Sequence, residues 1–246
     1  MPIKFFGLNN NIINFTFSSP QTKNIYLDEE KRKFIAEYKN KNKFEFNLNM
    51  IFENNTKGVD IDLTDDEVAN NMPKEDIRDK DQLKLIAKKI IEDFDKEHKN
   101  SEFEYHDFMK IGGWVYKNIK FNYSYSGKTE FTALDIYKKR AGVCHHLTRL
   151  SNALLYSLGY KVAYIGGYAL YENETTFNIK RAHAWSIIKI GNKWYSFDST
   201  WNILKGKVPI THVFSSIDSH DIFFEYSSTG HNISFEQKLQ GKLMKN

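Results

Sequence analysis

The chain has 246 residues, a net charge of +4, and 41% hydrophobic and 27% charged residues, the composition of a globular protein with a sizeable core. The charge excess is small and no dense basic block accompanies it, so nucleic acid is not an expected partner. The single cysteine excludes an internal disulfide and any cysteine cluster for zinc or iron–sulfur.

The first residues, Met1 to Gly7, do not have the basic region and long apolar region of a signal peptide. The sequence also contains no uninterrupted apolar run of the roughly 20 residues that cross a membrane. We therefore expect no membrane partner. The expected location is the cytoplasm, or outside the cell without a visible signal peptide.

Residues 1–56 are predicted to form a β-rich N-terminal module. Residues 44–50 alternate apolar and polar side chains with the period of two that places one face of a strand on a core. Further short apolar pieces, separated by Asn, Ser and Pro, are expected as strands at residues 4–6, 12–17, 24–27 and 33–38. A structural layer is the favoured interpretation, and a propeptide or a partner-binding strand is the alternative.

Residues 57–80 are predicted to be an acidic linker or surface loop, because they carry many Asp and Glu side chains, few apolar ones and Pro73. The stretch lacks the Gly and the terminal Glu of an EF-hand loop, so calcium binding is not expected. A second domain, residues 81–246, is predicted to follow.

The second domain is predicted to begin with helices. Residues 81–97 carry apolar side chains at the three-and-four spacing of one buried helical face. A second helix is expected over residues 105–118, although two adjacent glycines weaken its middle by roughly 1 kcal/mol each. An extended piece at residues 119–125 and a short helix at 133–139, capped by Thr132, complete this part.

The following stretch carries the chemistry. A buried helix is predicted over residues 147–157 and ends at the C-cap Gly159, so Cys144 lies at or just before its N-terminus. Next come a strand at 161–170, a polar loop at 172–179, and a hairpin with arms 182–190 and 193–198 around Gly191-Asn192. Residues 202–246 have weak patterning and are expected to wrap the domain.

Three side chains in this stretch suit covalent catalysis. A helix N-terminus and a neighbouring imidazolium lower the pKa of a thiol from about 8.5, and Cys144 has the helix from sequence alone. His183 lies on the first hairpin arm and Asp198 at the end of the second, so we expect them opposite each other on neighbouring strands. A carboxylate in that position orients the imidazole and stabilises its charged form.

Each of the three has an ordinary structural explanation: an inert buried cysteine, a hydrogen-bonded strand histidine and a turn-capping carboxylate. Their joint occurrence in suitable local structures favours catalysis. His145 and His146 are predicted to be first-turn helix residues, and no further ligands at suitable spacing indicate a metal site. Residues 126–128 lack the upstream glycine of a P-loop and are predicted to form a turn.

The flanking residues carry a resemblance. Gly142-Val143-Cys144, His183-Ala184-Trp185 and the stretch from Trp194 to Trp201 resemble the transglutaminase-like superfamily of papain-fold cysteine enzymes, over roughly residues 105–202. The resemblance implies an α+β fold in which the nucleophile helix packs on an antiparallel sheet, here with the β-rich N-terminal module. It also implies Cys144 as nucleophile, His183 as general base and acid, and Asp198 as the orienting residue.

The expected activity is acyl transfer from a protein or peptide substrate through a thioester, without a cofactor or a metal. Water as the second nucleophile makes a protease, peptidase or deamidase, and hydrolysis is favoured because the chain is short and carries no recognisable calcium-binding or barrel domains. The alternatives are a protein-glutamine transglutaminase and a catalytically silent binding or scaffold protein. No oligomeric state is assigned.

The oxyanion of the intermediate needs a side-chain donor beside the backbone N–H of the nucleophile, and the candidates are Tyr123, Tyr125 and Trp114. Trp185 and Trp201 are expected to pack against the hairpin.

Overall fold

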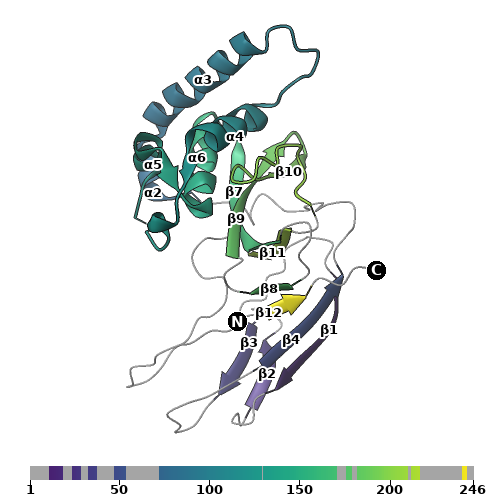
Figure 1. The fold of residues 1–246 in the computed structure, drawn as a ribbon. Coiled ribbons are helices and arrows are strands. Elements are labelled where there is room, and N and C mark those ends of the chain that lie inside the picture. The colour runs from purple at the N-terminus through teal and green to yellow at the C-terminus, as the bar shows by residue number, and fades with distance from the viewer. Residues whose placement is uncertain are drawn as a thin grey trace.

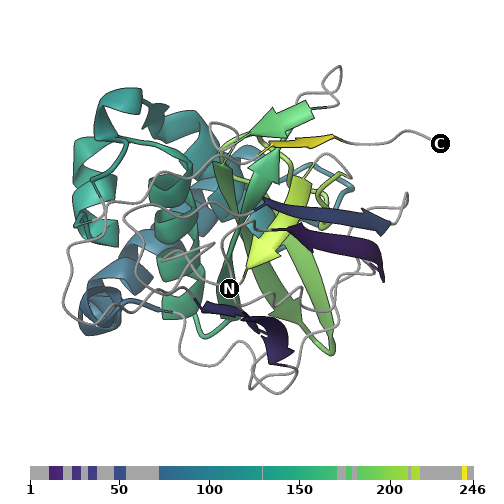
Figure 2. The same ribbon diagram turned by 90° about the horizontal axis from the view of Figure 1, so that it is seen from below.

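The structure is a computed structural model that describes residues 72–128, 130–170, 182–209 and 212 in full. Outside these ranges it describes only the backbone of short strands. Helices form one layer and lie to one side of a sheet (Figure 1), and the view from below shows the same separation (Figure 2). The architecture is therefore α+β, as predicted. Within the described residues, no helix is long and apolar enough to cross a membrane.

The helical layer is built around its last helix, which contacts the four described helices that precede it and also the sheet. Over the residues that the structure describes, its helices are α2 (Lys74–Arg78), α3 (Lys80–Glu97), α4 (Asp107–Asn118), α5 (Ala133–Lys139) and α6 (Cys144–Ser157). The helices predicted from the sequence correspond to α3, α4, α5 and α6. Thr132 caps α5 as expected, in a capping box with Asp135.

The prediction of a linker is wrong for residues 74–78, which form α2. Asp76 is 1% exposed, and its two carboxylate oxygens accept hydrogen bonds from the Ala133 N–H at 2.8 Å and from Arg149 Nε at 2.7 Å. These bonds join α2 to the start of α5 and to α6. The acidic composition indicated solvent exposure, but a buried carboxylate is stable when it is paired and hydrogen-bonded. Residues 57–71 lie outside the described residues.

A four-stranded sheet forms the other layer, in the order β10-β9-β7-β11, and every neighbouring pair is antiparallel. Its strands are β7 (Lys161–Ala169), β9 (Ala182–Ile190), β10 (Lys193–Phe197) and β11 (His212–Ser216). The predicted hairpin is β9 and β10. Helix α6 packs against β7 and β9, which confirms the predicted packing of a helix on an antiparallel sheet.

The segment before α6 differs from the prediction. Only β5 (Lys120–Phe121) of the expected extended piece is a strand, and a 3-10 turn, η1 (Tyr123–Tyr125), follows it. Strand β5 pairs in parallel with β6 (Ala141–Gly142), which leads directly into α6. This pairing holds the chain where it enters the helix.

The remaining strands form two-stranded pairs. β1 (Asn11–Ser18) pairs with β4 (Asn47–Glu53), and β2 (Asn24–Asp28) with β3 (Lys33–Glu37), so the N-terminal region is β-rich as predicted. The strand expected at residues 44–50 is displaced to β4, and the one expected at residues 4–6 lies outside the described residues. The polar loop expected at 172–179 contains β8 (Thr176–Asn178), which pairs with β12 (Gln240–Lys242).

The core lies between the two layers. It joins the apolar faces of α3, α4, α5 and α6 to side chains of β7, β9 and β10, and its side chains at 0% exposure include Leu83, Ile111, Leu150, Leu154, Ile188 and Phe197. Complete burial stabilises a side chain of this size by roughly 1.5–3 kcal/mol relative to leaving it exposed. The end of α6 that bears Cys144 is therefore anchored by a core that extends along the whole helix.

Candidate active site

Cys144 is the first residue of α6, and its side chain is half-buried. Val143 before it is extended, with φ −113° and ψ −176°, so the helix begins at the cysteine. The first N–H groups of a helix have no carbonyl partner within the helix, and they carry the positive end of its dipole. The position predicted from sequence is confirmed, and it offers backbone donors beside a thiol.

His146 fixes the turn that presents Cys144. Its Nδ1 accepts the Val143 N–H at 3.1 Å, and its Nε2–H donates to the Lys128 carbonyl at 2.6 Å. A Cβ at Gly142 would lie 2.5 Å from the Cβ of His146, closer than side chains tolerate. Glycine before the nucleophile therefore makes room for the imidazole. His146 is a first-turn residue as predicted, and its capping bonds are an addition to that prediction.

His183 and Asp198 meet in the sheet layer. His183 Nε2 donates to Asp198 Oδ2 at 2.7 Å, and the two residues are 8% and 0% exposed. They are not directly opposite each other, because the β9–β10 register pairs Phe197 with Ser186 and so brings Asp198 level with Trp185. The contact is diagonal, between residues on the same face of neighbouring strands.

A closed turn immobilises the Asp198 carboxylate. The backbone N–H and carbonyl of Asp198 both bond to Ile203, at 2.8 and 2.9 Å, and Asn202 takes the left-handed conformation, with φ 58°, that the turn requires. Oδ1 accepts the backbone N–H of Thr200 at 2.7 Å and of Trp201 at 3.3 Å. The turn thus leaves Oδ2 for the histidine.

A hydrogen bond ties this turn to the nucleophile helix. The hydroxyls of Ser151 on α6 and Ser199 beside Asp198 are 2.7 Å apart, and both residues are buried. Gly112 of α4 approaches the same turn, where a Cβ would come within 2.7 Å of Leu204 and 3.3 Å of Ser199. Both helices therefore position the turn relative to Cys144.

The geometry and the charges of the site favour an ion pair between His183 and Asp198. Burial lowers the pKa of His183, but the Asp198 carboxylate and then Cys144 raise it by more, each through its charge and a hydrogen bond, so the net shift is upward. Burial raises the pKa of Asp198, but His183 and His212 lower it by more. The His183 imidazole is thus stable as imidazolium, and the structure brings all three sequence-predicted residues together.

His212 is a further member of this cluster, and the sequence analysis missed it. The residue is 0% exposed, and its Nε2 lies 3.1 Å from Asp198 Oδ2. It stands at the start of β11, in the tail expected only to wrap the domain. The one available signal is a histidine directly before the apolar pair Val213-Phe214. That pattern indicates a buried strand histidine but does not identify its partner.

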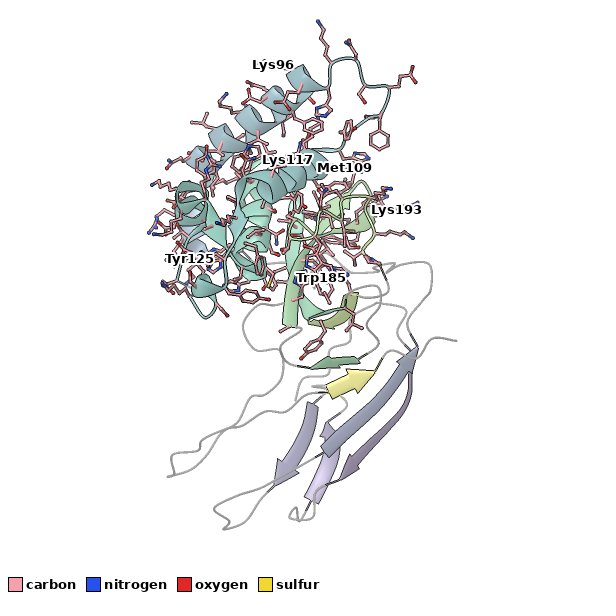
Figure 3. All side chains as sticks on the ribbon, viewed as in Figure 1. Lys96, Met109, Lys117, Tyr125, Trp185 and Lys193 are labelled. Carbon is pink, nitrogen blue, oxygen red and sulfur yellow. The ribbon has the colours of Figure 1, made fainter. Side chains whose placement is uncertain are left out.

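Two tryptophans enclose the histidines. The ring of Trp201 is centred 5.0 Å from His183, and Trp185 and Trp201 each make an edge contact with His212 at 5.2 Å. Trp185 is 2% exposed and lies on β9 near β11 (Figure 3), which agrees with its predicted packing role. Trp201 is half-buried and forms the outer cover of His183. Together they keep the imidazoles away from bulk water.

The candidates for the oxyanion donor differ in their surroundings. Trp114 stacks on Tyr137 at 5.6 Å, with the Arg140 guanidinium 4.7 Å from the Trp114 ring, so its indole packs on α5. Tyr125 lies on the outer side of the helical layer, with its ring 6.3 Å from that of His146 (Figure 3). Tyr123 is 78% exposed. The choice among the three stays a prediction.

A cavity of about 400 Å³ lies beside the nucleophile end of α6. Leu147, one turn after Cys144, and Thr200, which bonds Asp198, line it together with residues 116–121. A separate hollow of about 450 Å³ between α3, α4 and Tyr160 contains none of the three candidate residues. Cys144, His183 and Asp198 do not line the first cavity either, but it is lined by a residue one turn from Cys144 and by a residue that bonds Asp198.

A half-buried cysteine at a helix N-terminus beside a buried His–Asp pair is the arrangement of a cysteine-dependent enzyme. The sequence profile of the transglutaminase-like superfamily matches residues 74–199, just over half of the chain. The chain belongs to the transglutaminase-like superfamily.

A solved structure shows the same fold. A crystal structure from Cytophaga hutchinsonii, described as a candidate cysteine protease, is 23% identical over 82% of this chain and 71% of its own, with a TM-score of 0.52. The periplasmic domain of TgpA from Pseudomonas aeruginosa is 13% identical over 84% of this chain and 71% of its own, with a TM-score of 0.42. No curated protein matches the chain.

Proposed function

We propose that the protein is a cysteine hydrolase that cleaves peptide or glutamine amide bonds through a thioester on Cys144. One observation carries the proposal: the hydrogen bond of 2.7 Å between His183 Nε2 and Asp198 Oδ2. Cys144 also interacts with His183 and raises the pKa of its imidazole. Because Nε2 faces the carboxylate, Nδ1 is the nitrogen available to the sulfur. Cys144 is the nucleophile, His183 the acid and base, and Asp198 the orienting residue.

In the proposed reaction, Sγ of Cys144 attacks the substrate carbonyl carbon. The tetrahedral intermediate collapses, the C–N bond breaks, and His183 gives its proton to the leaving amine. His183 then takes a proton from water, whose oxygen attacks the thioester carbon. The C–S bond breaks, the acid product leaves, and the cysteine–imidazolium pair is restored. Asp198 stabilises the imidazolium and does not itself take the proton.

The start of α6 is suited to the developing oxyanion. The N–H of Cys144 belongs to the first turn of the helix, whereas that of Val143 is already bonded to His146. A free backbone donor beside the nucleophile stabilises negative charge on a carbonyl oxygen. The cavity that Leu147 and Thr200 border is the proposed site for the protein or peptide chain next to the scissile bond.

Cysteine alkylation tests the assembly of the site without a known substrate. We expect iodoacetamide to modify Cys144 rapidly down to about pH 5 in the wild type, because a neighbouring imidazolium stabilises the thiolate. His183→Ala should abolish this reactivity below about pH 7, and His106→Ala, which removes an exposed histidine, should not. Wild-type alkylation that follows an ordinary thiol near pH 8.5, unchanged by His183→Ala, would contradict the proposal and favour a silent scaffold protein.

Two assays run in parallel distinguish hydrolysis from amine transfer. Hydrolysis agrees with the protease description of the Cytophaga hutchinsonii protein. We expect cleavage or deamidation of a casein-derived peptide library, measured by mass spectrometry, and loss of that signal in Cys144→Ser. Incorporation of a labelled primary amine without cleavage would overturn hydrolysis and favour a protein-glutamine transglutaminase.

A further inference from the structure

We propose that His212 is a positioning residue for the reaction, a neutral imidazole that donates to Asp198 and holds its carboxylate toward His183. The inference rests on the proposed function. His212 lies beyond residue 199, where the match to the superfamily profile ends. The tail of the chain would therefore complete the site.

Strand pairing places His183 and His212 on the two strands that flank β7. His183 on β9 pairs with Gly167 of β7, and His212 on β11 pairs with Ala169 of the same strand. Paired residues project from the same face of a sheet, and so do residues two apart on one strand. Both imidazoles therefore stand on one face, with only a hydrogen atom and a methyl group between them on β7. Their ring centroids are 5.6 Å apart.

The contacts of His212 define its protonation. Asp198 is ionised, so its Oδ2 accepts, and the Nε2 of His212 at 3.1 Å must carry the hydrogen. The other nitrogen, Nδ1, is buried and has no hydrogen-bond partner among the described residues. A proton there would be a buried donor without an acceptor, which is costly. Burial accordingly lowers the pKa of His212, and the residue acts as a neutral donor.

The bond from His212 fixes an oxygen that the turn leaves unrestrained. Oδ1 of Asp198 already accepts from Thr200 and Trp201, whereas Oδ2 accepts, among the residues described, from the two histidines alone. With His212 in place, Oδ2 keeps its position whether His183 is charged or neutral. Without it, only the bond from His183 restrains Oδ2. That bond weakens when the imidazole gives up its Nδ1 proton and becomes neutral, so the carboxylate and the imidazole are less firmly oriented.

The same three side chains could instead hold a cation, because their ligand atoms lie within 4.8 Å of one another. However, the Nε2 atoms of both histidines are directed at one oxygen, at 2.7 and 3.1 Å, which is the geometry of two N–H donors sharing an acceptor. A metal between them would need both nitrogens deprotonated. The geometry therefore favours hydrogen bonds.

The experiment compares His212→Leu with His212→Gln in the full chain. Leu fills a similar volume without a donor, whereas the Gln amide can place an N–H where Nε2 was. The readouts are the pH profile of Cys144 alkylation, the pKa of His183 from NMR titration, and the melting temperature. We expect Leu to slow alkylation at pH 6 on the order of tenfold and to lower the pKa of His183, with Gln restoring most of both.

The outcomes separate this proposal from the proposed function. Wild-type alkylation that depends on His183 but is unchanged in a folded His212→Leu variant would overturn the role of His212 alone. Alkylation independent of His183 would overturn the proposed function itself. Equal losses in Leu and Gln, in parallel with melting temperature, would show a purely structural residue. Wild-type reactivity that chelation abolishes and Zn²⁺ restores would show a cation site instead.

Discussion

The two layers hold their functional side chains in different ways. Cys144 is positioned by its own neighbourhood: a helix starts at it, and His146, two residues later, ties the preceding turn. His183, Asp198 and His212 come from two strands and a turn, and hydrogen bonds to one carboxylate oxygen join them. The nucleophile is thus held by backbone geometry, and the acid–base group by charge in a buried network.

This difference indicates where the site is vulnerable. A buried network of charged and polar groups loses more than one bond when a member is removed, because the remaining groups are left unsatisfied. A helix terminus held by local contacts and a large core loses only the contact that is changed. Substitutions in the network should therefore act on chemistry, and those around α6 mainly on stability.

The largest expected effect is that of Asp198→Ala. The substitution leaves His183 without its orienting carboxylate, and we expect turnover to fall about 10³- to 10⁴-fold. Cleavage kinetics with a peptide substrate measure the effect, and Asp93→Ala, which removes an exposed carboxylate, should change nothing. A loss below tenfold in Asp198→Ala would mean that the network does not orient the acid–base group.

Asp76→Ala tests how much one buried carboxylate contributes to the stability of the helical layer. It removes the buried partner of Arg149 and of the Ala133 N–H, and we expect the free energy of unfolding to fall by about 3 kcal/mol. Chemical denaturation measures it. The matched control is Glu75→Ala, whose carboxylate is 53% exposed and 3.9 Å from Arg149, with an expected change below about 0.5 kcal/mol. Equal effects of the two would contradict the structural role of Asp76.

Gly142→Ala sharpens the comparison at the nucleophile itself. The added methyl group would displace His146, and we expect a destabilisation of about 1–3 kcal/mol together with slower Cys144 alkylation. Gly113→Ala is the control, because its Cβ would meet Leu204 at an ordinary 3.5 Å and should stabilise α4 by up to about 1 kcal/mol. Unchanged alkylation in Gly142→Ala would show that His146 does not position the thiol.

The smallest expected effect is the pH dependence of folding stability. Its sign for His145 in the helical layer is opposite to its sign for His183 in the sheet layer. Burial, and then the charge of His146, lowers the pKa of His145 from 6.5 to about 4, so the unfolded chain binds more protons between these values. Stability should therefore fall by roughly 1–2 kcal/mol as the pH falls from 6.5 to 4. His183, whose pKa is raised, contributes stability that is complete below pH 6.5 and is lost at alkaline pH.

Denaturation at several pH values, in the wild type and in His145→Gln, measures this contribution. The variant should lose less stability than the wild type between pH 6.5 and 4. A wild-type curve that the substitution does not change would show that His145 titrates in the folded state as it does in the unfolded chain.

The sequence predicted what local patterns encode. Periodicity and capping residues identified α3, α5 and α6, and the turn at Gly191-Asn192 identified the hairpin, so three candidate residues could be named. Asp76 could not be found in that way, because its partner Ala133 lies 57 residues away in the chain. His212 could not be found either, because it reaches Asp198 through the pairing of β11 with β7 and not across a recognisable turn. Composition even misdirected the prediction for Asp76, since an acidic stretch normally faces solvent.

The crowded surroundings of Asp198 have a consequence for where protons can travel. Four N–H groups, from Thr200, Trp201, His183 and His212, occupy its two oxygens before any substrate arrives. A carboxylate has about four lone-pair sites, so none is left to receive a further hydrogen. The mobile proton of His183 therefore has one outlet, through Nδ1 toward the sulfur and the substrate. The buried end of the imidazole is closed, so protons enter and leave His183 at its other end only.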